Sequence, residues 1–209
     1  MTWLRPGVQR IIASAPMKTT RLEAFSDGVL AIIITIMVLE MKAPAGASWS
    51  DLRPVASVFL TYVMSFVYVG IYWNNHHHML QATERVSGAV LWANLHLLFW
   101  LSLVPFVTRW MEINDFAPVP TALYGVVLLM AALSYTLLQL LIISMEGTNS
   151  KLQHAIGKDR KGKLSIALYV AAIAAAFWSP WISLGLYVFV ALIWLIPDRR
   201  IETTINETE

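Results

Sequence analysis

The sequence predicts an all-α polytopic membrane protein with six transmembrane helices. Of its 209 residues, 57% are hydrophobic and 13% are charged, whereas soluble domains average about 25% charged residues. Apolar stretches recur along the chain, and a membrane-spanning helix needs about 20 mostly apolar residues. The nine tryptophans suit the interface between lipid and water. No segment between the spans is long enough to fold as a soluble domain.

The first four spans are separate apolar segments, at residues 25–41, 55–75, 88–110 and 119–145. The second can continue as helix to residue 81, and Pro105 lies near the end of the third. The last two share an uncharged run between Lys163 and Asp198. At about 1.5 Å per residue this run far exceeds a hydrocarbon core of about 30 Å. It must therefore fold back, and Trp178-Ser-Pro-Trp181 is the expected turn between two short helices.

The two ends of the chain are expected to lie outside the helical domain. Residues 1–20 lack the continuous apolar core of a secretory signal. We interpret them as a flexible extension, within which Met17 is a second candidate start beside Met1. Residues 21–200 form one six-helix transmembrane domain, and residues 201–209 form a polar tail.

Positive charge predicts the orientation of the helices. Six spans place both termini on one side of the membrane. Twelve of the 15 lysines and arginines fall on that side, and only Lys42, Arg53 and Arg109 fall on the other. Cytoplasmic loops carry an excess of positive residues. Both termini are therefore expected to be cytoplasmic, in a multi-pass protein of the plasma membrane.

Ionisable residues stand at the start of the first span, where Arg21, Glu23 and Asp27 precede an apolar run. A charged residue at the centre of a lipid-facing helix costs about 2.5–3.5 kcal/mol on insertion scales. Such groups usually pair within a bundle or line a polar path. Further along the same span, Ile32, Ile36 and Leu39 lie on one face of the expected helix. Thr35 lies beside them on that face. The periodicity of these apolar residues alone favours a helix that faces lipid. The charged residues at the start of the span favour a helix with a functional role, because they need partners.

Polar residues also interrupt the second and third spans. Consecutive helical residues point about 100° apart, so His76, His77 and His78 cannot chelate one metal together. A histidine here could instead hydrogen-bond Asp27 or stack near Arg21. An amide in lipid is costly unless it is bonded, so Asn94 is expected to face protein, either as a structural contact between helices or as a functional group.

These motifs resemble the signature of the potassium-channel family known as transmembrane protein 175. The match begins with Arg21-x-x-x-Phe25-Ser26-Asp27 and the isoleucine-rich helix that carries Thr35. It extends over almost the whole chain, to about residue 200. The further motifs that carry it are Trp73-x-x-His76-His77, Asn94-Leu-His-Leu-Leu-Phe99, Leu103-Val-Pro105-Phe-Val-Thr108 and Trp194-Leu-Ile-Pro-Asp-Arg199.

The resemblance implies a homotetramer, because bacterial members have one six-helix repeat and animal members have two. It implies that the first helix of each subunit lines a central pore. The apolar constriction falls on Ile32, Ile36 and Leu39, and a threonine that contributes to potassium preference falls on Thr35. The resemblance also implies an interhelical network, which Asn94 is expected to join; its residues are Arg21, Ser26, Asp27, Trp73 and either His76 or His77.

A narrow apolar neck blocks ions by dewetting and conducts when it widens. The sequence contains no Thr-Val-Gly-Tyr-Gly loop, so selectivity through carbonyl rings is not expected. A modest preference for potassium over sodium would follow because potassium loses its hydration water more easily at the neck. The Thr35 hydroxyl would add to this preference. We expect potassium as the permeant ion, no cofactor, no resident metal and no nucleic-acid partner.

Two other classes of protein, a transporter and an enzyme, fit the sequence less well than a channel. A proton-coupled secondary transporter could use Asp27, Glu23 and the histidines as proton carriers. The spans lack the paired helices interrupted by Gly or Pro that mark a transporter's midplane site. An enzyme is not expected, because cysteine is absent and no zinc, serine-hydrolase or phosphate-loop motif occurs.

Overall fold

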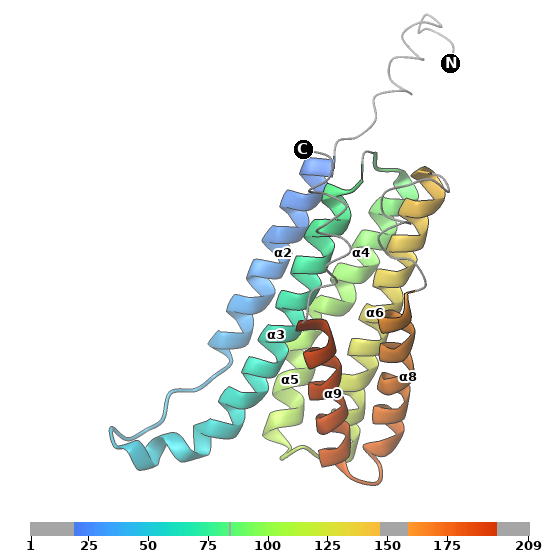
Figure 1. Cartoon of the computed structure of the whole chain (residues 1–209). Coiled ribbons are helices and arrows are strands. Elements are labelled where there is room, and N and C mark those ends of the chain that lie inside the picture. Colours follow the sequence, from blue (N-terminus) through green and yellow to red (C-terminus); the bar gives the residue numbers. More distant parts are fainter. Residues whose placement is uncertain (1–18, 84, 147–158, 196–209) are drawn as a thin grey trace, which may run out of the picture.

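The computed structural model describes residues 19–83, 85–146 and 159–195, which form one helical bundle (Figure 1). The described ranges contain no strand, in agreement with the predicted all-α class. Residues 1–18 of the predicted extension, with the alternative start at Met17, lie outside the described residues, as does the tail at 201–209.

The first span is α2 (Thr19–Leu39) at one edge of the bundle (Figure 1). It begins within the predicted extension, so the charged motif is itself helical. Its buried side chains recur every three or four residues, as expected for one face of a helix; they are Leu22, Ser26, Leu30, Ile33 and Met37. This face packs against the next helices, α3 (Arg53–Gln81), α4 (Gly88–Ser102) and α5 (Val104–Ile113).

A short 3-10 turn, η1 (Trp49–Leu52), connects α2 to α3 at the end of the bundle where α2 finishes. The hydroxyl of Ser48 donates to the Asp51 carboxylate, and the Ser48 N–H donates to Asp51 Oδ2 at 2.9 Å. These two bonds, the hydroxyl's first, hold the pKa of Asp51 below its ordinary value.

The predicted third span is present as one apolar segment, Gly88–Ile113, but it is interrupted and consists of two helices. A proline has no N–H to donate and crowds the preceding turn. Pro105 therefore breaks the hydrogen-bond ladder, and α4 ends at Ser102 before α5 begins at Val104. The N–H of Leu103 bonds the Trp100 carbonyl at 3.2 Å across this break.

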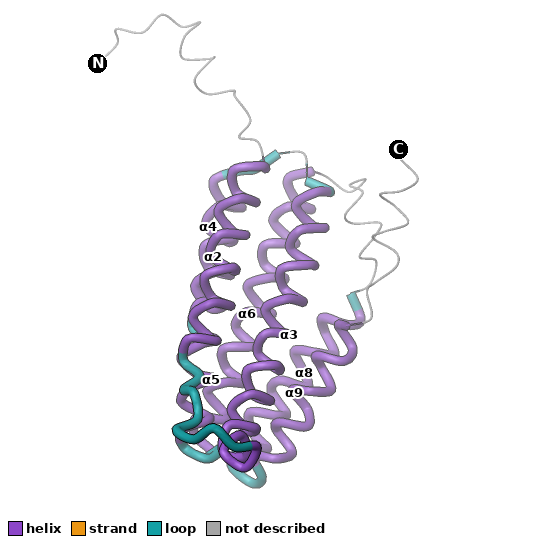
Figure 2. The backbone as a smooth tube through the Cα atoms, turned by 90° about the vertical axis from the view of Figure 1, so that its left-hand side faces the viewer, coloured by secondary structure: helices purple, strands orange, loops and turns teal. Residues whose placement is uncertain are grey.

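The remaining helices complete the bundle. The fourth predicted span is α6 (Pro118–Glu146), which follows a turn with left-handed backbone at Asp115 and Phe116. The fold-back predicted near Trp178 lies between α8 (Arg160–Ala175) and α9 (Pro180–Leu195). Both helices lie along only part of the bundle's length (Figure 2).

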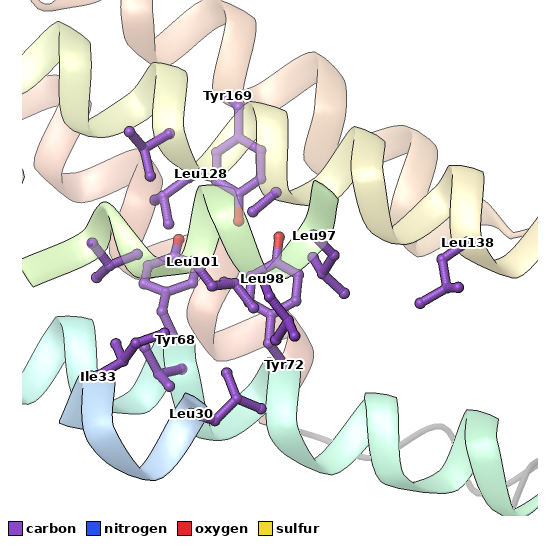
Figure 3. Packing of buried hydrophobic residues seen from close by; sticks show 14 of the residues in the cluster. Leu30, Ile33, Tyr68, Tyr72, Leu97, Leu98, Leu101, Leu128, Leu138 and Tyr169 are labelled. Carbon is purple, nitrogen blue, oxygen red and sulfur yellow. The ribbon is translucent and has the colours of Figure 1, made fainter. Parts of the chain in front are cut away.

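Four helical segments are long and apolar enough to cross a membrane, namely Thr19–Leu39, Val55–Gln81, Gly88–Ile113 and Pro118–Glu146. Helices α8 and α9 have 16 residues each, or about 24 Å, which is shorter than a hydrocarbon core of about 30 Å. In the interior, leucines of α4 pack beside Leu30 and Ile33 of α2 (Figure 3). The protein is therefore a helical membrane protein whose first helix is anchored along one face.

Candidate functional site

The face of α2 that points away from the bundle is apolar and uncovered. Ile32 is 58% exposed, Ile36 42% and Leu39 80%. Thr35 is also exposed, and its hydroxyl donates to the Ile32 carbonyl at 2.8 Å. A hydroxyl has two acceptor lone pairs, so this bond leaves the Thr35 oxygen able to contact a cation. The structure thus places the four predicted pore residues together on one exposed face.

The opposite face of α2 is tied to α3 and α4 by buried polar side chains. His76 Nε2 lies 2.7 Å from Asn94 Oδ1, and the Asn94 amide nitrogen donates to Ser26 Oγ at 3.0 Å. Ser26 Oγ then donates to the Leu22 carbonyl at 2.8 Å. Asn94 and Ser26 are fully buried, and His76 is 1% exposed. This chain of bonds links α3 through α4 to the first turns of α2.

The direction of this chain fixes the histidine tautomer. The Asn94 amide nitrogen is the donor to Ser26, so its oxygen is the acceptor that faces His76. His76 Nε2 must therefore carry the proton and donate it. In the neutral ring Nδ1 is then unprotonated, and it is buried without a hydrogen-bond partner among the described residues.

A second pair of contacts lies toward the surface of the same helices. The Trp73 indole nitrogen donates to Asp27 Oδ1 at 3.0 Å. His77 Nδ1 lies 2.8 Å from Glu23 Oε1, which is an ion pair when the ring is protonated. The Trp73 and His77 rings stack at 6.0 Å between centroids. The two adjacent histidines therefore have different partners, His76 in the buried chain and His77 at Glu23.

Arg21 was predicted to belong to the interhelical network, but it does not contact the other network residues in the structure. It is exposed on the first turn of α2 and forms no hydrogen bond or ion pair with the described part of the chain. Glu23 contacts His77 and so belongs to the network, which the sequence analysis did not predict. The signal that could have found it was its spacing, since Glu23 and Asp27 lie four residues apart on one helix face.

Comparison with known proteins identifies the family. The sequence profile described as "Endosomal/lysosomal potassium channel TMEM175" matches residues 21–105. A potassium channel of Chryseobacterium sp. (strain P1-3) is 58% identical over 191 residues, which cover 91% of this chain and all of that protein. The chain belongs to the TMEM175 family. The profile match contains every predicted site residue, from Arg21 to Asn94.

A solved TMEM175 structure has the same fold. The crystal structure described as a lysosomal potassium-selective channel TMEM175 homolog from Chamaesiphon minutus superposes with a TM-score of 0.71. The two sequences are 29% identical, and the match covers 86% of this chain and 97% of that one. The human protein named endosomal/lysosomal proton channel TMEM175 is 31% identical over 87 residues, 36% of this chain and 17% of its own length. The family is one of ion channels, which are not a class of enzyme.

In this TMEM175 member an open apolar groove of about 570 Å³ runs beside the exposed face of α2. Ile32 and Ile36 form one wall, and Pro105 and Phe106 of α5 belong to the other. Arg109 lies at its far end, where it bonds Glu112 at 2.7 Å and approaches Glu40 to 3.9 Å. Across the described residues, no three His, Cys, Asp or Glu side chains are grouped to hold a metal ion.

Proposed function

We propose that this protein is a channel that conducts potassium passively, with a modest preference over sodium. The observation that carries the proposal is the exposed apolar face of α2 formed by Ile32, Ile36 and Leu39. It belongs to a helix whose other face is fixed by buried hydrogen bonds. Bacterial relatives of the same length class are named potassium channels, and we extend that function to this chain.

The pore in this proposal lies between subunits. Helix α2 stands at the edge of the bundle (Figure 1), so one subunit cannot enclose a path lined by α2 alone. We propose a homotetramer in which four copies of α2 surround an axis, in keeping with the closed symmetry of most oligomers. Lipid can cover an exposed apolar face of any membrane helix; in the proposed tetramer the face of α2 lines the central path instead.

The proposed gate is the apolar neck. Rings of Ile32, Ile36 and Leu39 would exclude water when the four helices stand close, and a small widening would wet the neck and admit ions. Thr35 lies between Ile32 and Ile36 on the exposed face of α2, and its side chain is polar. We propose that its hydroxyl replaces part of the hydration of a potassium ion.

The remaining features of the proposal concern the membrane. We place the end of the bundle where α2 begins at the cytoplasm, together with both termini, in the plasma membrane. Arg21 is in the first turn of α2 and Arg85 lies between the end of α3 and the start of α4, at this end. Lys42 follows the end of α2, Arg53 begins α3 and Arg109 is in the second half of α5, toward the other end. The short helices α8 and α9 would be the fifth and sixth spans. Residues 21–200 would then form the channel domain, and the network around Asp27 and His76 would hold α2 in register.

The alternative is proton transport, either as a coupled transporter or through the pore. Animal relatives are named proton channels, and Glu23 and His77 form a titratable pair at the start of α2. The pair lies beside the proposed pore face and not within it. Flux of potassium from liposomes should therefore proceed without a proton gradient, whereas a coupled transporter would stop when the gradient is removed.

Cysteine accessibility tests the pore directly, since the native chain has no cysteine. In a Leu39→Cys channel, a charged thiol reagent that cannot cross the membrane should reduce the current. The matched control is Leu192→Cys on α9, which is 54% exposed on a helix that does not line the proposed pore. Unchanged current in the labelled Leu39→Cys channel, or equal block in both, would contradict the assignment of α2.

A further inference from the structure

Phe25 is the large apolar side chain of the motif at the start of α2, and its own subunit leaves it uncovered. It is 53% exposed, whereas Leu22 before it and Ser26 after it are buried. Ile32 lies seven residues further along the same helix, which is almost two full turns. Phe25 and Ile32 therefore point in nearly the same direction, away from the bundle.

The ring of Phe25 extends the exposed apolar face of α2 toward the start of the helix. Successive residues of a helix turn by about 100°, so Phe25, Ile32, Ile36 and Leu39 point within about 60° of one another. The exposed fraction of Phe25 lies between those of Ile32, 58%, and Ile36, 42%. If this face lines a pore, Phe25 lines it as well, at a level about 10 Å along the helix from Ile32.

The interhelical network fixes the direction of the Phe25 side chain. Ser26 is the next residue, and its hydroxyl oxygen accepts the Asn94 amide N–H at 3.0 Å. Asp27 follows and accepts the Trp73 indole N–H at 3.0 Å. All three residues belong to one helical turn, so the contacts that hold Ser26 and Asp27 also hold the rotation of Phe25. The exposed position of the ring is therefore a consequence of the network.

Gly28 leaves a gap on the same face between Phe25 and Ile32. It is exposed, and a Cβ at this position would meet no atom of another helix within 4 Å among the described residues. Glycine inside a helix costs about 1 kcal/mol relative to alanine, and no close contact within the described subunit requires it here. A pore lined by this face is therefore wider at Gly28 than at Phe25 or Ile32.

We propose that Phe25 forms a second constriction of the pore, at the end where α2 begins. The inference rests on the proposed function, in which α2 lines the central path of a tetramer. Four Phe25 rings narrow the entrance, and a hydrated chamber at Gly28 separates them from the neck. Glu23 and Asp27 lie two residues to either side of Phe25 and keep this single ring wet. The ring therefore limits the rate of permeation, and the longer apolar neck remains the gate.

Single-channel recordings of the full chain in planar bilayers test the ring by its size. If the ring and the neck contribute similar resistance, Phe25→Ala should raise the unitary conductance about twofold. Phe25→Trp should lower the conductance, and neither change should alter the open probability, since the neck is intact. The matched control is Phe189→Ala on α9, at a side chain that is 49% exposed and lies away from the proposed pore. A conductance that does not follow the size of the side chain at position 25 would overturn the proposal.

Access to a cysteine at Gly28 tests the chamber, since the native chain has no cysteine. A charged thiol reagent that cannot cross lipid, applied to both faces of the bilayer, should change the current of the Gly28→Cys channel slowly. Adding Phe25→Ala should raise the rate about tenfold, which corresponds to a barrier lower by about 1.4 kcal/mol. Adding Phe189→Ala should leave the rate unchanged.

The outcomes separate this proposal from the proposed function. Equal rates with and without the Phe25 ring would overturn the second constriction and leave α2 as the pore helix. A current that stays unchanged, although mass spectrometry shows the cysteine at Gly28 fully modified, would overturn both the constriction and the assignment of α2 to the pore.

Discussion

The Trp73 indole nitrogen donates a hydrogen bond to Asp27 Oδ1 over 3.0 Å and so joins α3 to the start of α2. The same indole stacks on His77, which contacts Glu23. Two carboxylates on one helix face are thus held by two neighbouring aromatic side chains. If α2 lines the pore as proposed, these contacts set where that helix begins and how it is rotated.

Trp73→Phe should loosen this attachment. Phenylalanine keeps an aromatic ring beside His77 but cannot donate to Asp27. A hydrogen bond to a charged group contributes about 1.5–3 kcal/mol, and 1 kcal/mol shifts the unfolding midpoint of a chain of this size by about 2–4 °C. The midpoint in detergent should fall accordingly, and the open probability should change.

The matched control is Trp92→Phe on α4, whose side chain is 75% exposed and has no such bond. Its midpoint and open probability should remain those of the native channel. Equal effects from both substitutions would mean that loss of an indole, and not of the Asp27 bond, causes the change.

Asn94→Leu should destabilise the subunit itself. Leucine has the same branching and number of side-chain heavy atoms as asparagine, but the substitution leaves the His76 Nε2 proton buried without an acceptor. An unsatisfied buried donor costs about 1–3 kcal/mol, which thermal unfolding in detergent can measure. Asn114→Leu, at an exposed amide that donates to the Trp110 carbonyl, is the comparison and should cost less.

A double substitution separates lost bonding from lost packing. Asn94→Leu with His76→Phe replaces both partners by apolar groups, which can be nearly neutral. The double variant should therefore be more stable than the sum of the single effects predicts. Strict additivity would show that the His76–Asn94 contact contributes no coupling energy.

Thr35→Ala should lower the ratio of potassium to sodium permeability. If the hydroxyl contributes as much as an ordinary hydrogen bond, about 0.5–1.5 kcal/mol, the ratio should fall by about twofold to tenfold. Reversal potentials under bi-ionic conditions measure it. The control is Thr61→Ala on α3, a buried hydroxyl that bonds the Ser57 carbonyl at 2.9 Å. A ratio that does not move in Thr35→Ala removes this residue from the account of selectivity.

Ile32→Asn should raise the current at rest, because a polar side chain in the neck keeps it wet. Leu140→Asn makes the same kind of change at a side chain on α6 that is 59% exposed, away from the proposed pore. Only the first variant should leak in single-channel recordings. Resting current no greater than that of the native channel would move the gate away from Ile32.

Hydropathy predicted the apolar spans well, since lipid exposure makes whole helices apolar and leaves turns polar. It did not predict the break at Leu103, because Pro105 can end a helix or interrupt one, and the sequence does not decide between the two. The pairing of His77 with Glu23 was also missed. Adjacent helical residues point to different neighbours, and a sequence does not say which neighbour each one meets. The cavity of about 70 Å³ between α3, α6, α8 and α9 gave no signal in the sequence either, since four separate helices contribute its wall.

The most direct measurement for the central claim is the reversal potential of the purified protein in a planar bilayer, with potassium on one side and sodium on the other. The account predicts a current that reverses toward the potassium equilibrium potential without a proton gradient. A robust current that reverses near zero would contradict the preference for potassium. No current, together with proton-dependent flux in liposomes, would contradict the channel itself.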